Sequence, residues 1–133
     1  MTDKPSADDV RLSWSPDDQG GLTGWVEVRN ARQSVVRVSG KPGLRPLGVG
    51  GEALPTECIV TLEMRTPGYV DVPSGGVARA PVGWAGWDGP PASGRVEVTV
   101  SDLSYTVEVD GPAQPTGRGP ATNLWSSWFE LVC

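Results

Sequence analysis

The residue types that could carry chemistry are few in this chain of 133 residues. The chain contains no histidine, and histidine is the commonest general base and metal ligand in proteins. A Ser-His-Asp or Cys-His catalytic group therefore cannot form from these residues. The two cysteines, Cys58 and Cys133, are too few to build a zinc site on their own.

Adjacent carboxylates are the remaining candidates for catalysis or calcium binding. Asp8-Asp9 and Asp17-Asp18 fall in an expected lead segment and in a turn, without the spacing of an EF-hand, so we interpret them as solvated side chains. The stretch Gly48 to Gly51 lacks the Lys-Ser/Thr of a phosphate-binding loop. The sequence therefore predicts no enzymatic activity, no cofactor and no metal site.

Tryptophan is the one aromatic residue in surplus, with six copies against one Phe and two Tyr. Trp25 alternates with Val26 and Val28, which predicts that it lies on the outer face of a strand. Trp84 and Trp87 are three residues apart, as are Trp125 and Trp128, and this spacing places the rings of a pair on opposite faces of an extended chain. We name Trp25 and Trp87 as exposed candidates for ligand binding. The other interpretation is that the rings fill the core.

The two cysteines leave two interpretations open. Cys58 and Cys133 both fall on expected inner faces, so a disulfide between them would close a long loop and contribute about 4 kcal/mol in the loop-entropy model. In a reducing compartment both would stay thiols, and Cys58 would be core filler.

Charge and hydropathy limit the kinds of partner that the chain is expected to bind. The net charge is −5, from 11 basic and 16 acidic residues, and the arginines are scattered, so we predict no nucleic-acid partner and no electrostatic binding to anionic lipid. No apolar run approaches the ~20 residues of a membrane span. The polar residues 1–6 do not resemble a signal peptide. A cytoplasmic or virion-borne protein and a trimmed ectodomain both remain possible.

Frequent turns and period-two alternation predict an all-β fold. The chain has 18 Gly and 13 Pro, which interrupt almost every window long enough for a three-turn helix. We expect residues 1–9 to be a flexible lead and residues 10–133 to form one antiparallel, immunoglobulin-like β-sandwich of about eight or nine short strands. The expected strands are 10–14, 22–30, 35–38, 58–64, 69–72, 78–84, 96–100, 103–109 and 125–133. The segment 43–47 could be a further strand, at a sheet edge because Pro46 cannot donate to a ladder.

Three of these segments carry sharper expectations. The phase of alternation reverses at Ser101-Asp102, which predicts a hairpin pairing Val100 with Leu103; a single long strand with a β-bulge at Ser101 is the alternative. Because Ser-Asp lacks Gly or Asn, we expect a four-residue loop. A short helical turn at 123–128, before the last strand, is possible. Alternation also predicts that two further sets of residues point inward. These sets are Cys58, Val60, Leu62 and Met64 in one strand and Phe129, Leu131 and Cys133 in the last.

The order of turn segments resembles a known family. A strand ends at Asn30, the segment Gly40-Lys41-Pro42-Gly43 follows, and Pro73-Ser74-Gly75-Gly76 precedes a later strand. Over about residues 10–110 this order is similar to the DUF4232-type domain of secreted proteins and lipoproteins of actinobacteria. The resemblance implies residence in the cell envelope or outside the cell and a non-enzymatic role. The family often has a cysteine where this chain has 34–38, so its disulfide is not carried over.

Together these observations favour a non-catalytic, immunoglobulin-like interaction or structural domain of the bacterial cell envelope, with a protein or envelope component as partner. One alternative is a carbohydrate or small-ligand binding module, which requires at least two exposed tryptophans on one face. Another is a phage or virion structural domain, which requires self-association.

Overall fold

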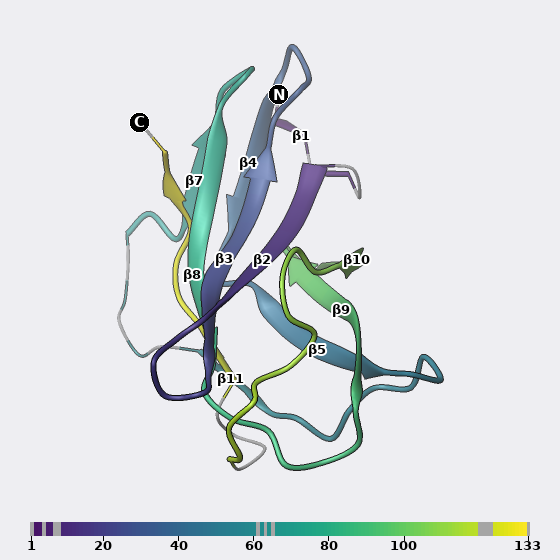
Figure 1. Cartoon of the computed structure of the whole chain (residues 1–133). Coiled ribbons are helices and arrows are strands. Elements are labelled where there is room, and N and C mark those ends of the chain that lie inside the picture. Colours follow the sequence, from purple (N-terminus) through teal and green to yellow (C-terminus); the bar gives the residue numbers. More distant parts are fainter. Residues whose placement is uncertain are drawn as a thin grey trace.

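Alternating apolar residues and frequent turns produce an all-β, immunoglobulin-like sandwich (Figure 1). The structure is a computed structural model, and it describes residues 2–3, 5–6, 9–60, 62, 64, 66–119 and 124–132. This described part of the chain contains strands and turns but no α-helix. The predicted fold class is confirmed.

The larger sheet has the strand order β2-β3-β8-β11-β6. Neighbours from β2 to β11 are antiparallel, whereas β6 runs parallel to β11. Strand β12 pairs with β8 beyond the end of β11. The strands are β2 (Val10–Pro16), β3 (Leu22–Arg29), β6 (Cys58–Val60), β8 (Val77–Trp84), β11 (Leu124–Ser126) and β12 (Glu130–Leu131).

Two three-stranded sheets complete the fold, with orders β10-β9-β5 and β1-β4-β7. Strand β2 links the larger sheet to the first of them, because Trp14 N–H donates to Asp110 O at 2.8 Å and Asp110 N–H donates to Leu12 O at 2.9 Å. The strands are β1 (Thr2–Asp3), β4 (Val35–Ser39), β5 (Gly43–Gly48), β7 (Tyr69–Val72), β9 (Ala92–Val100) and β10 (Leu103–Glu108).

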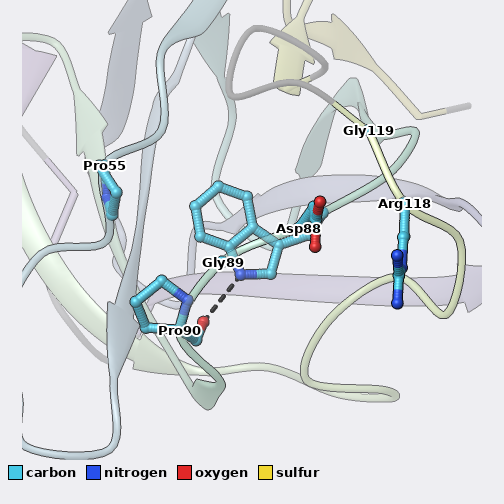
Figure 2. A pocket seen from close by; sticks show the side chains of 7 residues that line it. Pro55, Asp88, Gly89, Pro90, Arg118 and Gly119 are labelled. Carbon is cyan, nitrogen blue, oxygen red and sulfur yellow. Dashed lines mark hydrogen bonds between the residues drawn. The ribbon is translucent and has the colours of Figure 1, made fainter.

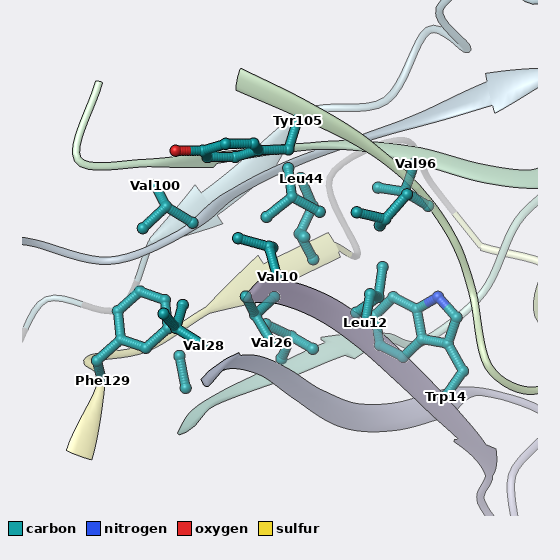
Figure 3. Packing of buried hydrophobic residues seen from close by; sticks show 14 of the residues in the cluster. Val10, Leu12, Trp14, Val26, Val28, Leu44, Val96, Val100, Tyr105 and Phe129 are labelled. Atoms are coloured by element: carbon teal, nitrogen blue, oxygen red, sulfur yellow. The ribbon is translucent and has the colours of Figure 1, made fainter. Parts of the chain in front are cut away.

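The core is one cluster built mainly of valines from the inner faces of the sheets (Figure 3). Trp84 and Phe129 are its largest fully buried side chains, and Trp14 is buried as the alternation predicts. The indole nitrogens of Trp14 and Trp84 have no hydrogen-bond partner among the described residues. Since an unpaired buried donor is costly, these rings contribute to the core through packing.

The hairpin of β9 and β10 has the predicted register, with Val100 opposite Leu103. The expected four-residue loop is wrong, and so is the alternative of one long bulged strand. Ser101 and Asp102 form a two-residue turn with φ of 50° and 68°, the left-handed geometry of a type I′ turn. Ser39 N–H donates to Ser101 Oγ at 2.8 Å, which holds this turn in place.

Two predicted inner faces fail where strands leave the sheet. Strand β6 ends at Val60, and Leu62 and Met64 are 95% and 91% exposed. The last predicted strand is divided into β11 and β12, with Ser127 N–H donating to Pro81 O between them, so no helical turn forms at the described residues 124–128. Phe129 is buried as predicted, but Leu131 is exposed.

The expected N-terminal lead makes contacts that alternation did not predict. Strand β1 pairs in parallel with β4, so that Thr2 lies opposite Val35. The Tyr105 hydroxyl donates to Pro5 O at 2.5 Å, and burial, together with the charge of Asp9, raises the pKa of Tyr105. These contacts connect the start of the chain to β4 and β10.

Candidate functional site

The outer face of the larger sheet carries a hollow of about 240 Å³, which we call the tryptophan groove. Strand register builds it from two rows of residues across the sheet. One row runs Ser13, Trp25 and Pro81, and the other runs Ser15, Thr23, Gly83 and Trp125. The lining residues are Ser13, Ser15, Thr23, Gly24, Trp25, Pro81, Val82 and Trp125.

Trp25 forms one wall of the groove and is 44% exposed, as its alternation with buried valines predicts. The Arg79 guanidinium lies 5.8 Å from the centre of its ring, within the range of a cation–π contact. Arg79 is paired across the sheet with Glu27, on the side of Trp25 away from Thr23. The contact therefore supports the ring from outside the groove.

Trp125 also lines the groove, and it was not among the predicted site residues. Its indole lies over Gly83, so that a Cβ built at position 83 would collide with Nε1 and lie 2.6 Å from Cζ2. A glycine inside a strand often marks such a close approach. That signal at Gly83 could have indicated an aromatic neighbour, but the sequence alone does not identify which one.

The predicted exposure of Trp87 is wrong, because Trp87 is only 6% exposed. Its ring packs against Trp84 at 5.7 Å between centroids, and its indole N–H donates to Pro90 O at 2.8 Å (Figure 2). The segment after β8 turns inward, since Trp87 N–H also donates to Gly117 O. The strand geometry that would place Trp84 and Trp87 on opposite faces therefore does not apply.

A second hollow, of about 600 Å³, lies beside Trp87 among loops (Figure 2). Its lining includes Pro55, Pro90, Asp88 and Arg118. Trp87 also lines this space, but nearly all of its surface is buried. The second hollow thus lacks the exposed aromatic plate that the sequence predicted for it.

Cys58 lies in a third hollow, of about 280 Å³, and is half-buried, with no disulfide partner among the described residues. Burial raises the pKa of the Cys58 thiol, although hydrogen bonds with Leu44 backbone and the Ser126 hydroxyl act in the opposite direction. A raised pKa makes a thiol a poor nucleophile at neutral pH. Cys133 lies outside the described residues, so the disulfide with Cys58 stays a prediction.

Ion pairs border the tryptophan groove on the Trp25 side. Glu27 accepts from Arg29 Nε at 2.5 Å and from Arg79 Nε at 3.0 Å. Burial raises the pKa of Glu27, but the two arginine hydrogen bonds outweigh burial and hold the pKa below its ordinary value. Glu27 is therefore a compensated anion and has little capacity for general-base chemistry.

Metal sites, membrane-spanning helices and similarity to known proteins are the remaining sources of functional information. Within the described ranges, no three acidic or cysteine side chains come together as a metal site would require. None of the described residues belongs to a helix long and apolar enough to span a membrane. Comparison of the chain with protein-family models gave no match, and comparisons with curated proteins and with solved structures gave none either.

Proposed function

We propose that this chain is a non-catalytic, immunoglobulin-like recognition domain of the bacterial cell envelope, and that its ligand binds in the tryptophan groove. The observation that carries the proposal is that Trp25 and Trp125 line one hollow on the outer face of the larger sheet. Large, rigid aromatic side chains are the residues that most often dominate binding energy. The envelope location is supported by the resemblance to DUF4232-type domains.

The residues that line the groove, and the strands that bear them, favour binding over catalysis. Its lining contains no carboxylate, cysteine, lysine or arginine, so it offers no acid, base or strong nucleophile. Its walls and floor come from four paired strands, β2, β3, β8 and β11. A site on rigid strands needs little ordering when a ligand binds, which favours affinity.

Sedimentation with purified cell walls tests this function. The wild-type domain should pellet with cell walls of an actinobacterium, and Trp25→Ala and Trp125→Ala should each remain mostly in the supernatant. The matched control is Tyr69→Ala, which removes an exposed ring from β7 in another sheet and should pellet like wild type. Equal pelleting of all four proteins would contradict a binding role for the groove.

A further inference from the structure

We propose that the occupant of the tryptophan groove is a neutral saccharide, with one sugar ring held between Trp25 and Trp125. This inference rests on the proposed function and names the chemical class of its ligand. Three features of the groove carry it: unused hydrogen-bonding groups, the absence of charge, and the arrangement of the two rings.

The groove presents polar groups that make no hydrogen bond to the other described residues. Ser13, Ser15 and Thr23 point to the outer face, and no hydrogen bond joins any of these hydroxyls to another described residue. Trp125 Nε1 likewise has no partner in the described part of the chain. Hydroxyls both donate and accept hydrogen bonds, and so do the hydroxyls of a sugar.

The lining carries no ionisable side chain, although the chain has a net charge of −5. Glu27 pairs with both Arg29 and Arg79 on the Trp25 side of the groove, and none of these three side chains lines the hollow. An anionic or cationic ligand would lose hydration in the groove without gaining a partner charge. The uncharged lining therefore favours a neutral ligand.

The two indole rings line the hollow and provide its largest apolar surfaces. They stand on β3 and β11, and the Trp125 indole reaches from β11 over Gly83 of the intervening strand β8. The volume of about 240 Å³ is below the roughly 300–1,000 Å³ of sites for drug-sized ligands. A single sugar ring suits this space, with its C–H face against an indole and its hydroxyls toward Ser13, Ser15 and Thr23.

A proline-rich peptide is the competing occupant, because such peptides also dock in aromatic grooves. A polyproline segment has carbonyl acceptors but no backbone N–H at its prolines. The three hydroxyls of the groove would therefore donate hydrogen bonds to such a peptide, but the prolines would offer them no N–H from which to accept. Sugar hydroxyls satisfy both capacities, which is why we favour the saccharide.

Calorimetric titration with soluble oligosaccharides tests the inference. The probes are the hexamers of β-1,4-linked N-acetylglucosamine, β-1,4-linked glucose and β-1,3-linked glucose, with polygalacturonate and decaproline as anionic and peptide comparisons. At least one neutral hexamer should bind with a Kd on the order of 1 mM or tighter. Binding should weaken about tenfold or more in Trp25→Ala and Trp125→Ala and stay unchanged in Tyr69→Ala.

Thr23→Val is the second variant, because it keeps a β-branched side chain on an exposed strand position and removes only the hydroxyl. It should fold normally and weaken saccharide binding severalfold. Binding of decaproline or polygalacturonate alone, or of no hexamer up to roughly 5 mM, would overturn the saccharide. If sedimentation with cell walls still depended on Trp25 and Trp125, the proposed function would survive that result; if it did not, both would fail.

Discussion

The indole of Trp125 occupies the space that a side chain at position 83 would need. The two residues are cross-strand partners, with Gly83 on β8 and Trp125 on β11. Because Gly83 has no side chain, the Trp125 ring can lie against the sheet and line the tryptophan groove.

Gly83→Ala should remove the groove without removing a tryptophan. The new methyl group would collide with Trp125 Nε1, so the ring must move, and ligand binding should fall about as far as in Trp125→Ala. The measurement is a saccharide titration of folded protein. Gly43→Ala is the control, because a Cβ at this strand position meets Thr99 Cβ at an ordinary 3.4 Å. Unchanged binding in Gly83→Ala would show that this placement of Trp125 is unnecessary.

Asp102→Gly should stabilise the protein. Asp102 has a φ of 68° in the β9–β10 turn, and a left-handed conformation costs a non-glycine residue about 1 kcal/mol. We expect the free energy of unfolding to rise by about 0.5 kcal/mol, because the greater entropy of glycine in the unfolded chain offsets part of this relief. Denaturant unfolding monitored by tryptophan fluorescence measures it. A lower midpoint would contradict the two-residue turn.

Glu27 should make stability depend on pH in the acid range. Its pKa in the folded protein lies below the ordinary value of 4.5, so the unfolded chain binds its proton first as pH falls. The contribution is thus complete above about pH 5 and is lost as pH falls through the folded-state pKa.

Glu27→Gln should therefore destabilise the protein by about 1 kcal/mol at pH 7, and the difference from wild type should shrink toward pH 3. Chemical unfolding across this range gives the comparison. The control is Glu108→Gln, because Glu108 is highly exposed and lies 3.9 Å from Arg95; its effect should be smaller. A constant Glu27→Gln difference at every pH would contradict the ion pairs.

Cys58 should react slowly in the native, reduced protein. Burial raises the pKa of its thiol, and the thiolate is the reactive form. Labelling by iodoacetamide at pH 8, followed by peptide mass analysis, should show Cys58 modified much more slowly without denaturant than with it. Equal rates would contradict its burial. Peptide analysis of unreduced protein also tests the predicted bond to Cys133.

The sequence predicted the sheet faces well where strands are long and continuously paired. Val26 and Val28 face inward, Trp25 faces outward, and Val100 pairs with Leu103, because a half-buried strand imposes period two on its residues. Prediction failed where the chain is no longer paired with a neighbouring strand. Strand β6 ends before Leu62 and Met64, so alternation does not predict whether these residues are buried.

For the same reason, only one of the two tryptophans of the groove could be predicted from the sequence. Trp25 belongs to a long strand, so its exposure follows from the local pattern. Trp125 joins it only through the pairing of β11 with β8, and these strands are far apart in sequence. Trp87 was misplaced because its burial depends on contacts with Pro90 and Gly117 in separate loops.

The most direct test of the central claim is a ¹H–¹⁵N spectrum of the indole N–H groups during titration with a neutral hexasaccharide. The chain has six tryptophans, and each signal can be assigned with a Trp→Phe variant. We predict that the signals of Trp25 and Trp125 shift together in a saturable way, while those of the buried Trp14, Trp84 and Trp87 stay in place. Shifts confined to the buried indoles, or no shift at Trp25 and Trp125, would contradict a ligand site in the tryptophan groove.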